Sequence, residues 1–153
     1  MARRNSEISE LRTVVDSADN RESKARRIAE LIRVAGEYRW VGIYDVTSDE
    51  IAAMAWSGVG APSFPRFPIT QGLNGAAVRA GSAVIVGDVT RDARYLTTLG
   101  TTRSEMVVPV KNALGAVIGT IDVESEIVDR FTEVDRQFIE SCANQIVSLW
   151  RDG

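Results

Sequence analysis

RSEMVVPVKNALGAVIGTIDVES, residues 103–125, predicts a β-hairpin at the centre of the fold. Apolar and polar residues alternate on both sides of the turn-forming run at 112–115, which is typical of two antiparallel strands joined by a tight turn. We expect one face of this hairpin to pack into the core, because its members are all apolar or small. They are Met106, Val108, Val110, Val117, Gly119, Ile121 and Val123.

The opposite face of the predicted hairpin carries acids. If the turn is centred on residues 113–114, Glu105 lies directly opposite Asp122, and Glu124 follows on the same face. Like charges across a ladder destabilise a sheet by roughly 0.2–1 kcal/mol. Either the face is wet or an arginine lies between the acids, or a ligand with a positive group such as an amine binds there. Thr120 would add a hydroxyl, and the apolar wall would come from Val107, Pro109 and Ile118.

Length and composition predict one globular domain. The chain has 153 residues, of which 44% are hydrophobic and 25% charged, and its formal net charge is −3. This balance gives no general attraction to nucleic acid or to anionic membranes. No apolar run approaches the roughly 18 residues that span a bilayer, and the start of the chain lacks the apolar stretch of a secretory signal. We therefore expect a cytoplasmic protein with neither nucleic acid nor membrane as a partner.

Histidine and cysteine usage excludes several kinds of chemistry. The sequence has no His and one Cys, Cys142. Histidine-based nucleophile pairs, imidazole metal ligands and an intrachain disulfide are therefore excluded. We expect no cofactor and no metal, while binding or catalysis by carboxylates stays open.

The rest of the chain predicts helices at both ends of a sheet. Residues 5–17 and 20–36 have helical periodicity, and Asp19 with Glu22 resembles a capping box at the start of the second helix. Residues 38–46 and 51–56 alternate as a second hairpin. A final helix begins at Thr132, with Asp135 three residues later. Its predicted apolar face consists of Val134, Phe138, Ile139, Cys142, Ile146, Leu149 and Trp150.

Between these elements lie two candidate covering loops. Residues 58–68 hold three of the four prolines, which predicts an irregular loop or a sheet edge, and residues 88–102 form a polar connection with one helical turn at 91–95. Residues 73–81 predict a short helix of small residues, and 82–87 another strand. The glycines at 72 and 75 do not match a phosphate-binding motif.

The motifs WVGIY at 40–44, PITQGLNGAAVRAG at 68–81, VIVGDV at 84–89, RSEMVVPV at 103–110, GAVIGTIDVES at 115–125 and FTEVDRQFIESCANQI at 131–146 together resemble a GAF domain. Within that family, WVGIY, SEMVVP and IDVES are most similar to the stand-alone free methionine-(R)-sulfoxide reductases. The resemblance implies an α+β fold: an antiparallel sheet of about six strands, with terminal helices on one face and a ligand cavity closed by loops on the other. It divides the single domain, 1–153, into N-terminal helices (1–36), sheet and loops (37–130) and a C-terminal helix (131–152).

The resemblance also implies roles for individual residues. In the reductases, the acids that match Glu105, Asp122 and Glu124 hold the free amino acid, although Asp is usual at the last of these positions. Both reductase cysteines are missing, since Thr98 stands where the catalytic thiol would fall and GLNG has Asn74 in place of Cys. We therefore expect no catalytic residues. The expected ligand-binding residues are Glu105, Asp122, Glu124, Thr120, Trp40, Tyr44, Trp56, Asn74 and Thr98.

Three functions follow from this sequence. The first is a non-catalytic sensory or regulatory module that binds an amine or amino-acid-like ligand and signals through a separate partner chain. The second is a dimerisation or interaction module with a vestigial cavity, paired as a homodimer through the terminal helices. The third, a free methionine-(R)-sulfoxide reductase, is disfavoured because threonine cannot form a sulfenic acid. The absence of His disfavours heme, Cys142 on the last helix disfavours a covalently attached bilin, and cyclic nucleotides stay open.

Overall fold

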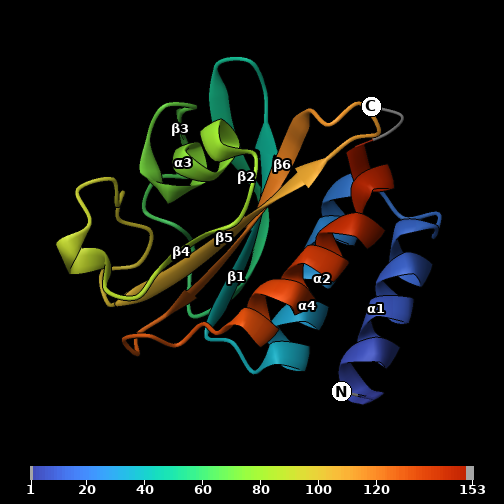
Figure 1. Cartoon of the computed structure of the whole chain (residues 1–153). Helices are drawn as coiled ribbons and strands as arrows, with labels where there is room; N and C mark the ends of the chain where they lie inside the picture. The colour runs from blue at the N-terminus through green and yellow to red at the C-terminus, as the bar shows by residue number, and fades with distance from the viewer. Residues whose placement is uncertain (1, 151–153) are drawn as a thin grey trace.

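The chain folds as a mixed α/β structure around one sheet. The computed structural model describes the backbone of residues 2–150 and the side chains of residues 6–150, so residues 1 and 151–153 of the predicted domain lie outside the described part. Six strands form the sheet in the order β3-β2-β1-β6-β5-β4, and every neighbouring pair is antiparallel (Figure 1). The predicted α+β fold with about six antiparallel strands is therefore confirmed.

The elements follow the predicted order. The strands are β1 (Trp40–Val46), β2 (Glu50–Gly58), β3 (Arg66–Pro68), β4 (Val84–Val86), β5 (Ser104–Lys111) and β6 (Val117–Ser125). The helices are α1 (Ala2–Val15), α2 (Arg21–Gly36), α3 (Gly72–Ala80) and α4 (Glu133–Gln145), with 3-10 turns η1 (Val89–Arg91) and η2 (Val147–Trp150).

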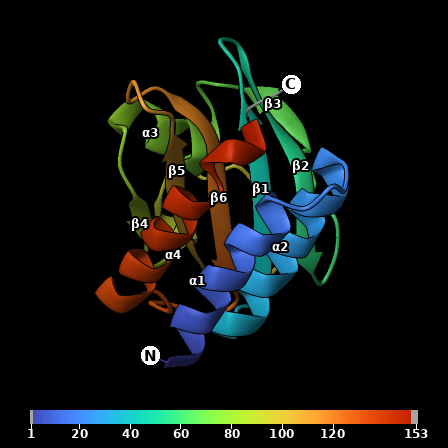
Figure 2. The same ribbon diagram turned by 90° about the vertical axis from the view of Figure 1, so that its right-hand side faces the viewer.

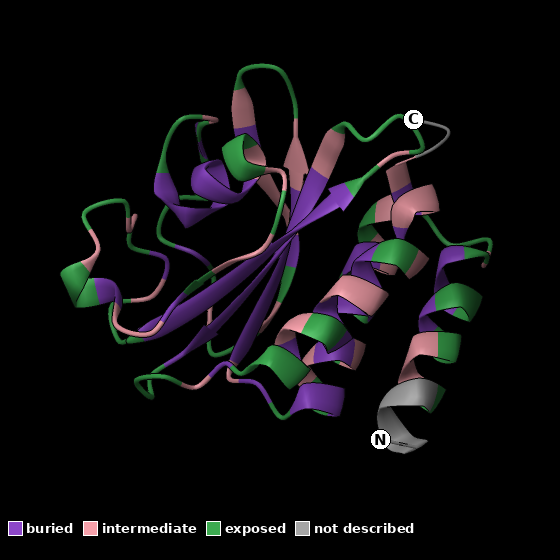
Figure 3. Cartoon of the chain, in the orientation of Figure 1, coloured by how far each residue is buried: buried purple, intermediate pink, exposed green. Residues whose placement is uncertain are grey.

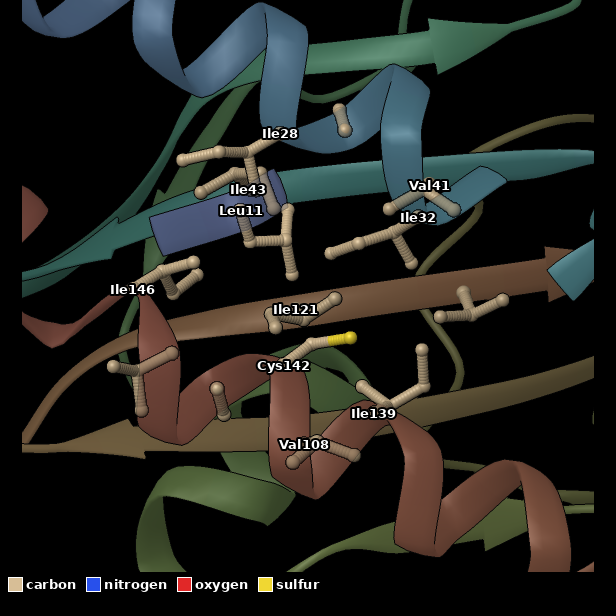
Figure 4. Close-up of a cluster of buried hydrophobic side chains, with 14 of the residues drawn as sticks. Leu11, Ile28, Ile32, Val41, Ile43, Val108, Ile121, Ile139, Cys142 and Ile146 are labelled. Carbon is tan, nitrogen blue, oxygen red and sulfur yellow. The ribbon is translucent and has the colours of Figure 1, made fainter. Parts of the chain in front are cut away.

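Three helices cover one face of the sheet, and α3 with the long loops covers the other. Helices α1, α2 and α4 lie together in front of the strands in Figure 2. Their apolar side chains meet the apolar face of the β5–β6 hairpin in the main core, where Ile28, Ile121 and Ile139 are fully buried (Figure 4). Cys142 lies among them and is also fully buried. The predicted core position of this cysteine is confirmed.

The pairing within the β5–β6 hairpin differs from the predicted register. Glu105 lies opposite Glu124, and Asp122 lies opposite Val107. The prediction that Glu105 faces Asp122 directly was wrong, although all three acids do share one face. The like-charge pair across the ladder is consequently formed by the two glutamates.

A longer turn and a bulge explain the shifted register. The N–H of Asn112 donates to the carbonyl of Ala116, and strand pairing begins at Lys111 and Val117. A register shift immediately before Lys111 adds a further residue on β6. Because a bulge interrupts the alternation of side chains, Ile118 packs against the helix-side core instead of forming a wall on the acidic face.

Several predicted boundaries also need correction. Asn20, not Asp19, caps α2 by accepting from the N–H of Ser23, and the helical turn in the polar connection is η1, not 91–95. Helix α4 ends at Gln145, because the chain tightens into η2, a common ending for an α-helix. Val134 is exposed on α4 rather than part of its apolar face.

The apolar stripe of α1 is used within the chain. Leu11, Val14 and Val15 are buried in the main core beside α2 and α4. This stripe is therefore not a free surface for a second copy. Within residues 2–150, no helix combines the length and apolar character needed to cross a bilayer.

The N-terminus of α4 generates a stability prediction. Thr132 and Asp135 form the complete capping box, in which each side chain accepts from the backbone N–H of the other. Replacing Thr132 by Ala should lower the free energy of unfolding by about 1 kcal/mol, the usual effect of losing an N-cap hydroxyl. Urea denaturation measures it, with Thr13→Ala on the exposed side of α1 as the control. Equal stability of the two variants would show that the cap contributes nothing.

Candidate functional site

Three carboxylates meet at the centre of the sheet, on the face that lacks the long helices. Glu105 comes from β5, and Asp122 and Glu124 come from β6. One carboxylate oxygen from each lies within 4.8 Å of the others. Their exposed fractions are 2%, 0% and 0%, and Figure 3 shows both strands buried through this region. The interpretation of a wet acidic face is therefore wrong.

The three acids have no Lys or Arg partner among residues 6–150. Each acid instead keeps one buried oxygen without a hydrogen-bond partner: Oε1 of Glu105, Oδ1 of Asp122 and Oε2 of Glu124. Leaving a buried polar group unpaired costs about 1–3 kcal/mol and more when it is charged. The interpretation that an arginine lies between the acids is therefore also wrong.

Neutral side chains hold the remaining oxygens in place. Asn74 of α3 donates its amide N–H to Oδ2 of Asp122 at 3.1 Å and accepts from the Thr120 hydroxyl at 2.6 Å. Thr102 donates to Oε1 of Glu124 at 2.8 Å. The structure thus brings together six residues of the site from α3, β5, β6 and the loop before β5.

Burial dominates the electrostatics of the cluster. It raises the pKa of Glu105 well above its ordinary value of 4.5, and the charges of Asp122 and Glu124 raise it further. Burial also raises the pKa of Glu124 well above 4.5, and hydrogen bonds from the hydroxyls of Thr98 and Thr102 partly oppose this rise. The pKa of Asp122 is also raised by burial, against hydrogen bonds that include that of Asn74. The cluster therefore holds protons to a higher pH than isolated carboxyls do.

Two aromatic rings from β1 line the same face. Trp40 pairs with Glu124 and Tyr44 pairs with Thr120, and both rings are buried. Between them is Gly42, opposite Asp122, where a Cβ would lie only 2.5 Å from the Trp40 ring and 2.9 Å from the Tyr44 ring. Glycine at this position lets both rings approach the acids. Burial and the three neighbouring carboxylates raise the pKa of the Tyr44 phenol well above 10.0.

The two predicted covering loops are joined over this face. Ser63 in the 58–68 loop donates its N–H to the carbonyl of Thr98 at 2.8 Å, and its hydroxyl donates to the same carbonyl. The indole N–H of Trp40 donates to the carbonyl of Gly60 at 2.8 Å. The site is thus covered by both loops in this structure.

Trp56, one of the expected ligand-binding residues, lies apart from the three acids and is partly exposed. It lies on β2 opposite Gly42, two strands away from Asp122, and is 36% exposed.

The sequence did not predict the positions of Thr102 and Tyr95 next to Glu124. Burial and the charge of Glu124 raise the pKa of Tyr95 to about 12. Both residues lie in an irregular loop without periodicity, so no sequence signal distinguished them from other polar loop residues.

The buried cluster generates a pH prediction for the ligand-free protein. Because the folded acids have raised pKa values, the folded chain binds more protons than the unfolded chain above about pH 4.5. Their contribution to stability is therefore greatest below that pH and is lost as pH rises through the folded pKa values. Glu105→Gln should raise the free energy of unfolding at pH 8 by about 1 kcal/mol or more and flatten the decline between about pH 5 and pH 8.

Urea denaturation at both pH values, with a chelator present, measures this effect. Glu30→Gln is the matched control, because it makes the same chemical change on the exposed surface of α2. That control should stay within about 0.5 kcal/mol of the wild type. A Glu105→Gln protein with the wild-type pH slope would contradict the raised pKa values.

Known proteins resemble this chain in sequence and in fold. The family model for the GAF domain matches residues 20–148. Protein YtsP of Bacillus subtilis is 24% identical over 131 residues, which cover 86% of this chain and 80% of that protein.

Two solved structures of free methionine-R-sulfoxide reductases are similar to this chain in fold and in sequence. The free methionine-R-sulfoxide reductase from Neisseria meningitidis, in complex with its substrate, is 30% identical with a TM-score of 0.82, covering 93% of this chain and 84% of that one. The type II free methionine-R-sulfoxide reductase from Thermoplasma acidophilum is 27% identical with a TM-score of 0.76, covering 85% and 94%. The resemblance first noted in the motifs is thereby confirmed. The match over residues 20–148, on a six-stranded sheet with this helix arrangement, shows that the chain belongs to the GAF domain family.

Proposed function

We propose that this GAF domain is a non-catalytic regulatory module that binds a small amine or amino-acid-like ligand at the carboxylate cluster. The observation that carries the proposal is the unpaired buried oxygen on each of Glu105, Asp122 and Glu124. A positively charged group placed among them would supply the missing partners. The GAF fold supports small-molecule binding in general, and the acids make the expected ligand cationic.

A primary ammonium fits the spacing of the acids. Charge-assisted N–H···O bonds are about 2.7–2.9 Å long, and an ammonium offers three donors. Three oxygens within 4.8 Å of one another can be reached from a single nitrogen at about that length. The rings of Trp40 and Tyr44 would then cover the aliphatic part of the ligand.

The similarity to reductases supports an amino-acid-like ligand. One solved relative is a free methionine-R-sulfoxide reductase in complex with its substrate, at 30% identity. The fold that this chain shares with the reductase, together with the acids on this chain's own central hairpin, makes free amino acids and their sulfoxides the first ligands to test.

Reduction of a sulfoxide is not part of this proposal. The chain has one cysteine, Cys142, and it is fully buried in the core on the helix side of the sheet (Figure 4). The site face carries Asn74 and Thr98 instead. A hydroxyl or amide cannot cycle through a sulfenic acid and a disulfide, so the ligand would be held and released unchanged.

The homodimer, a separate signalling partner and a cytoplasmic location stay proposals. Since Leu11, Val14 and Val15 are buried within the chain, a pair of copies would have to meet through other residues of the helical layer. The exposed Val34 of α2 and Val134 of α4 are apolar side chains of that layer.

A ligand screen tests the binding proposal. At 100 times its dissociation constant a ligand adds about 2.7 kcal/mol to the free energy of unfolding, which for a chain of this size corresponds to a rise of about 5–10 °C in Tm. Free amino acids, methionine-(R)-sulfoxide and simple amines should include at least one such ligand. The N-acetyl derivative of that ligand should give no shift, because it has lost the ammonium.

Glu105→Gln should abolish the shift, whereas Glu30→Gln should preserve it. Equal shifts for the free and acetylated ligands, or equal shifts in both variants, would refute recognition of an ammonium by the acids. The absence of any shift across the panel would refute the proposed ligand class.

A direct assay tests the non-catalytic part. Purified protein given free methionine-(R)-sulfoxide and a thiol donor should show no turnover above the protein-free rate, since no thiol lies on the site face. Turnover would refute this prediction, and its loss in Cys142→Ser would assign it to the one cysteine.

A further inference from the structure

The carboxylate cluster has the donor set of a metal site as well as of an ammonium site. One oxygen from each of Glu105, Asp122 and Glu124 lies within 4.8 Å of the other two. Independently, each acid keeps a fully buried oxygen that has no hydrogen-bond partner. We propose that the cluster binds a divalent cation of the size of Ca²⁺, in competition with the amine ligand.

The spacing of the oxygens leaves room for an ion as large as calcium. Three points within 4.8 Å of one another have a common centre no more than about 2.8 Å from each. Calcium binds oxygen at about 2.3–2.6 Å in flexible geometry, whereas magnesium requires about 2.0–2.1 Å and a near-ideal octahedron. A small inward movement of the side chains would suffice for calcium. Magnesium would also demand a near-ideal octahedron, which three carboxylates anchored on two central strands are less able to supply.

The chemistry of the donors points the same way. All of the cluster's charged donors are carboxylates, the ligands preferred by hard cations. Asn74 points its amide N–H at Asp122, while its amide oxygen accepts from the Thr120 hydroxyl, so the three acids alone supply the oxygens for an ion. No His exists in the sequence, and Cys142 lies in the opposite core, so the site offers no nitrogen or sulfur donor of the kind that zinc and copper favour.

The charge of the cluster also suits a divalent ion. Three acids have no cationic side chain paired with them in the described part of the chain. A 2+ ion would compensate more of this charge than a single ammonium does. Because both cations would use the same oxygens, binding of one should weaken the other by mass action. This inference does not require the proposed amine function to be correct.

Terbium luminescence tests the ion site with a defined probe. Tb³⁺ replaces Ca²⁺ in oxygen sites and emits when a nearby indole is excited. Trp40 pairs directly with Glu124, so bound Tb³⁺ should show strong sensitised emission. CaCl₂ should displace it at a concentration at least about tenfold below that needed for MgCl₂. CaCl₂ alone should also raise Tm in metal-free buffer.

Matched variants locate the ion. Glu105→Gln and Asp122→Asn should each weaken Tb³⁺ binding about tenfold or more, while Glu30→Gln should leave it unchanged. Two acid variants are used so that a folding defect in one, checked by circular dichroism, does not decide the result. Absence of sensitised emission, or equal binding by all variants, would overturn the proposal. Equal displacement by Ca²⁺ and Mg²⁺ would overturn the size selectivity.

The outcome is separable from that of the amine screen. Amine shifts measured with a chelator present, together with a failed Ca²⁺ titration, would refute the ion site alone. A positive Ca²⁺ titration without any amine shift would refute the amine ligand alone. If Ca²⁺ and the amine both bind, added CaCl₂ should raise the apparent dissociation constant of the amine. An amine dissociation constant that does not change with CaCl₂ would show that the ion binds elsewhere.

Discussion

The burial of three unpaired carboxylates on the central strand pair is the constraint to which the rest of the structure responds. Glu105, Asp122 and Glu124 are almost completely removed from water, each keeps one buried oxygen without a hydrogen-bond partner, and no Lys or Arg of the described part of the chain pairs with them. A buried charge without a partner is strongly destabilising. The fold must therefore supply the compensating stability elsewhere, and the acids retain a free energy that a cationic ligand can recover on binding.

That stability comes from the opposite face of the same two strands. The residues that alternate with the acids, such as Met106, Ile121 and Val123, are fully buried beneath α1, α2 and α4. Because side chains alternate across a strand, β5 and β6 place fully buried apolar residues and buried acids at adjacent positions. Movement of an acid is limited by backbone that the apolar core holds in place. The site is consequently rigid below, while the loops above it rest on a few hydrogen bonds, including those from Ser63 and Trp40.

The sequence predicted the part of this arrangement that follows from periodicity. Alternation in residues 103–125 correctly placed the three acids on the face opposite the core residues, although it assigned Ile118, next to the bulge, to the wrong face. The capping box at Thr132 correctly placed the start of α4. Register was not predictable in this way, because a bulge before Lys111 leaves both flanking patterns intact while shifting the partners. The contact of Thr102 with Glu124 was equally hidden, since it depends on the path of an irregular loop.

Asn74 shows how the site can differ from that of a reductase with little change in shape. At the position where the resemblance places a cysteine, the structure has an amide that joins Thr120 to Asp122 by two hydrogen bonds. A thiol is a weak donor and a weak acceptor, so it could not support both partners equally well. The amide fixes the orientation of the Asp122 carboxylate at one of the two positions where the resemblance places a cysteine. The polar groups that hydrogen-bond to the acids, the Asn74 amide and the Thr102 hydroxyl, act as donors to them. The hydrogen bonds of the site therefore orient the carboxylates without neutralising their charge.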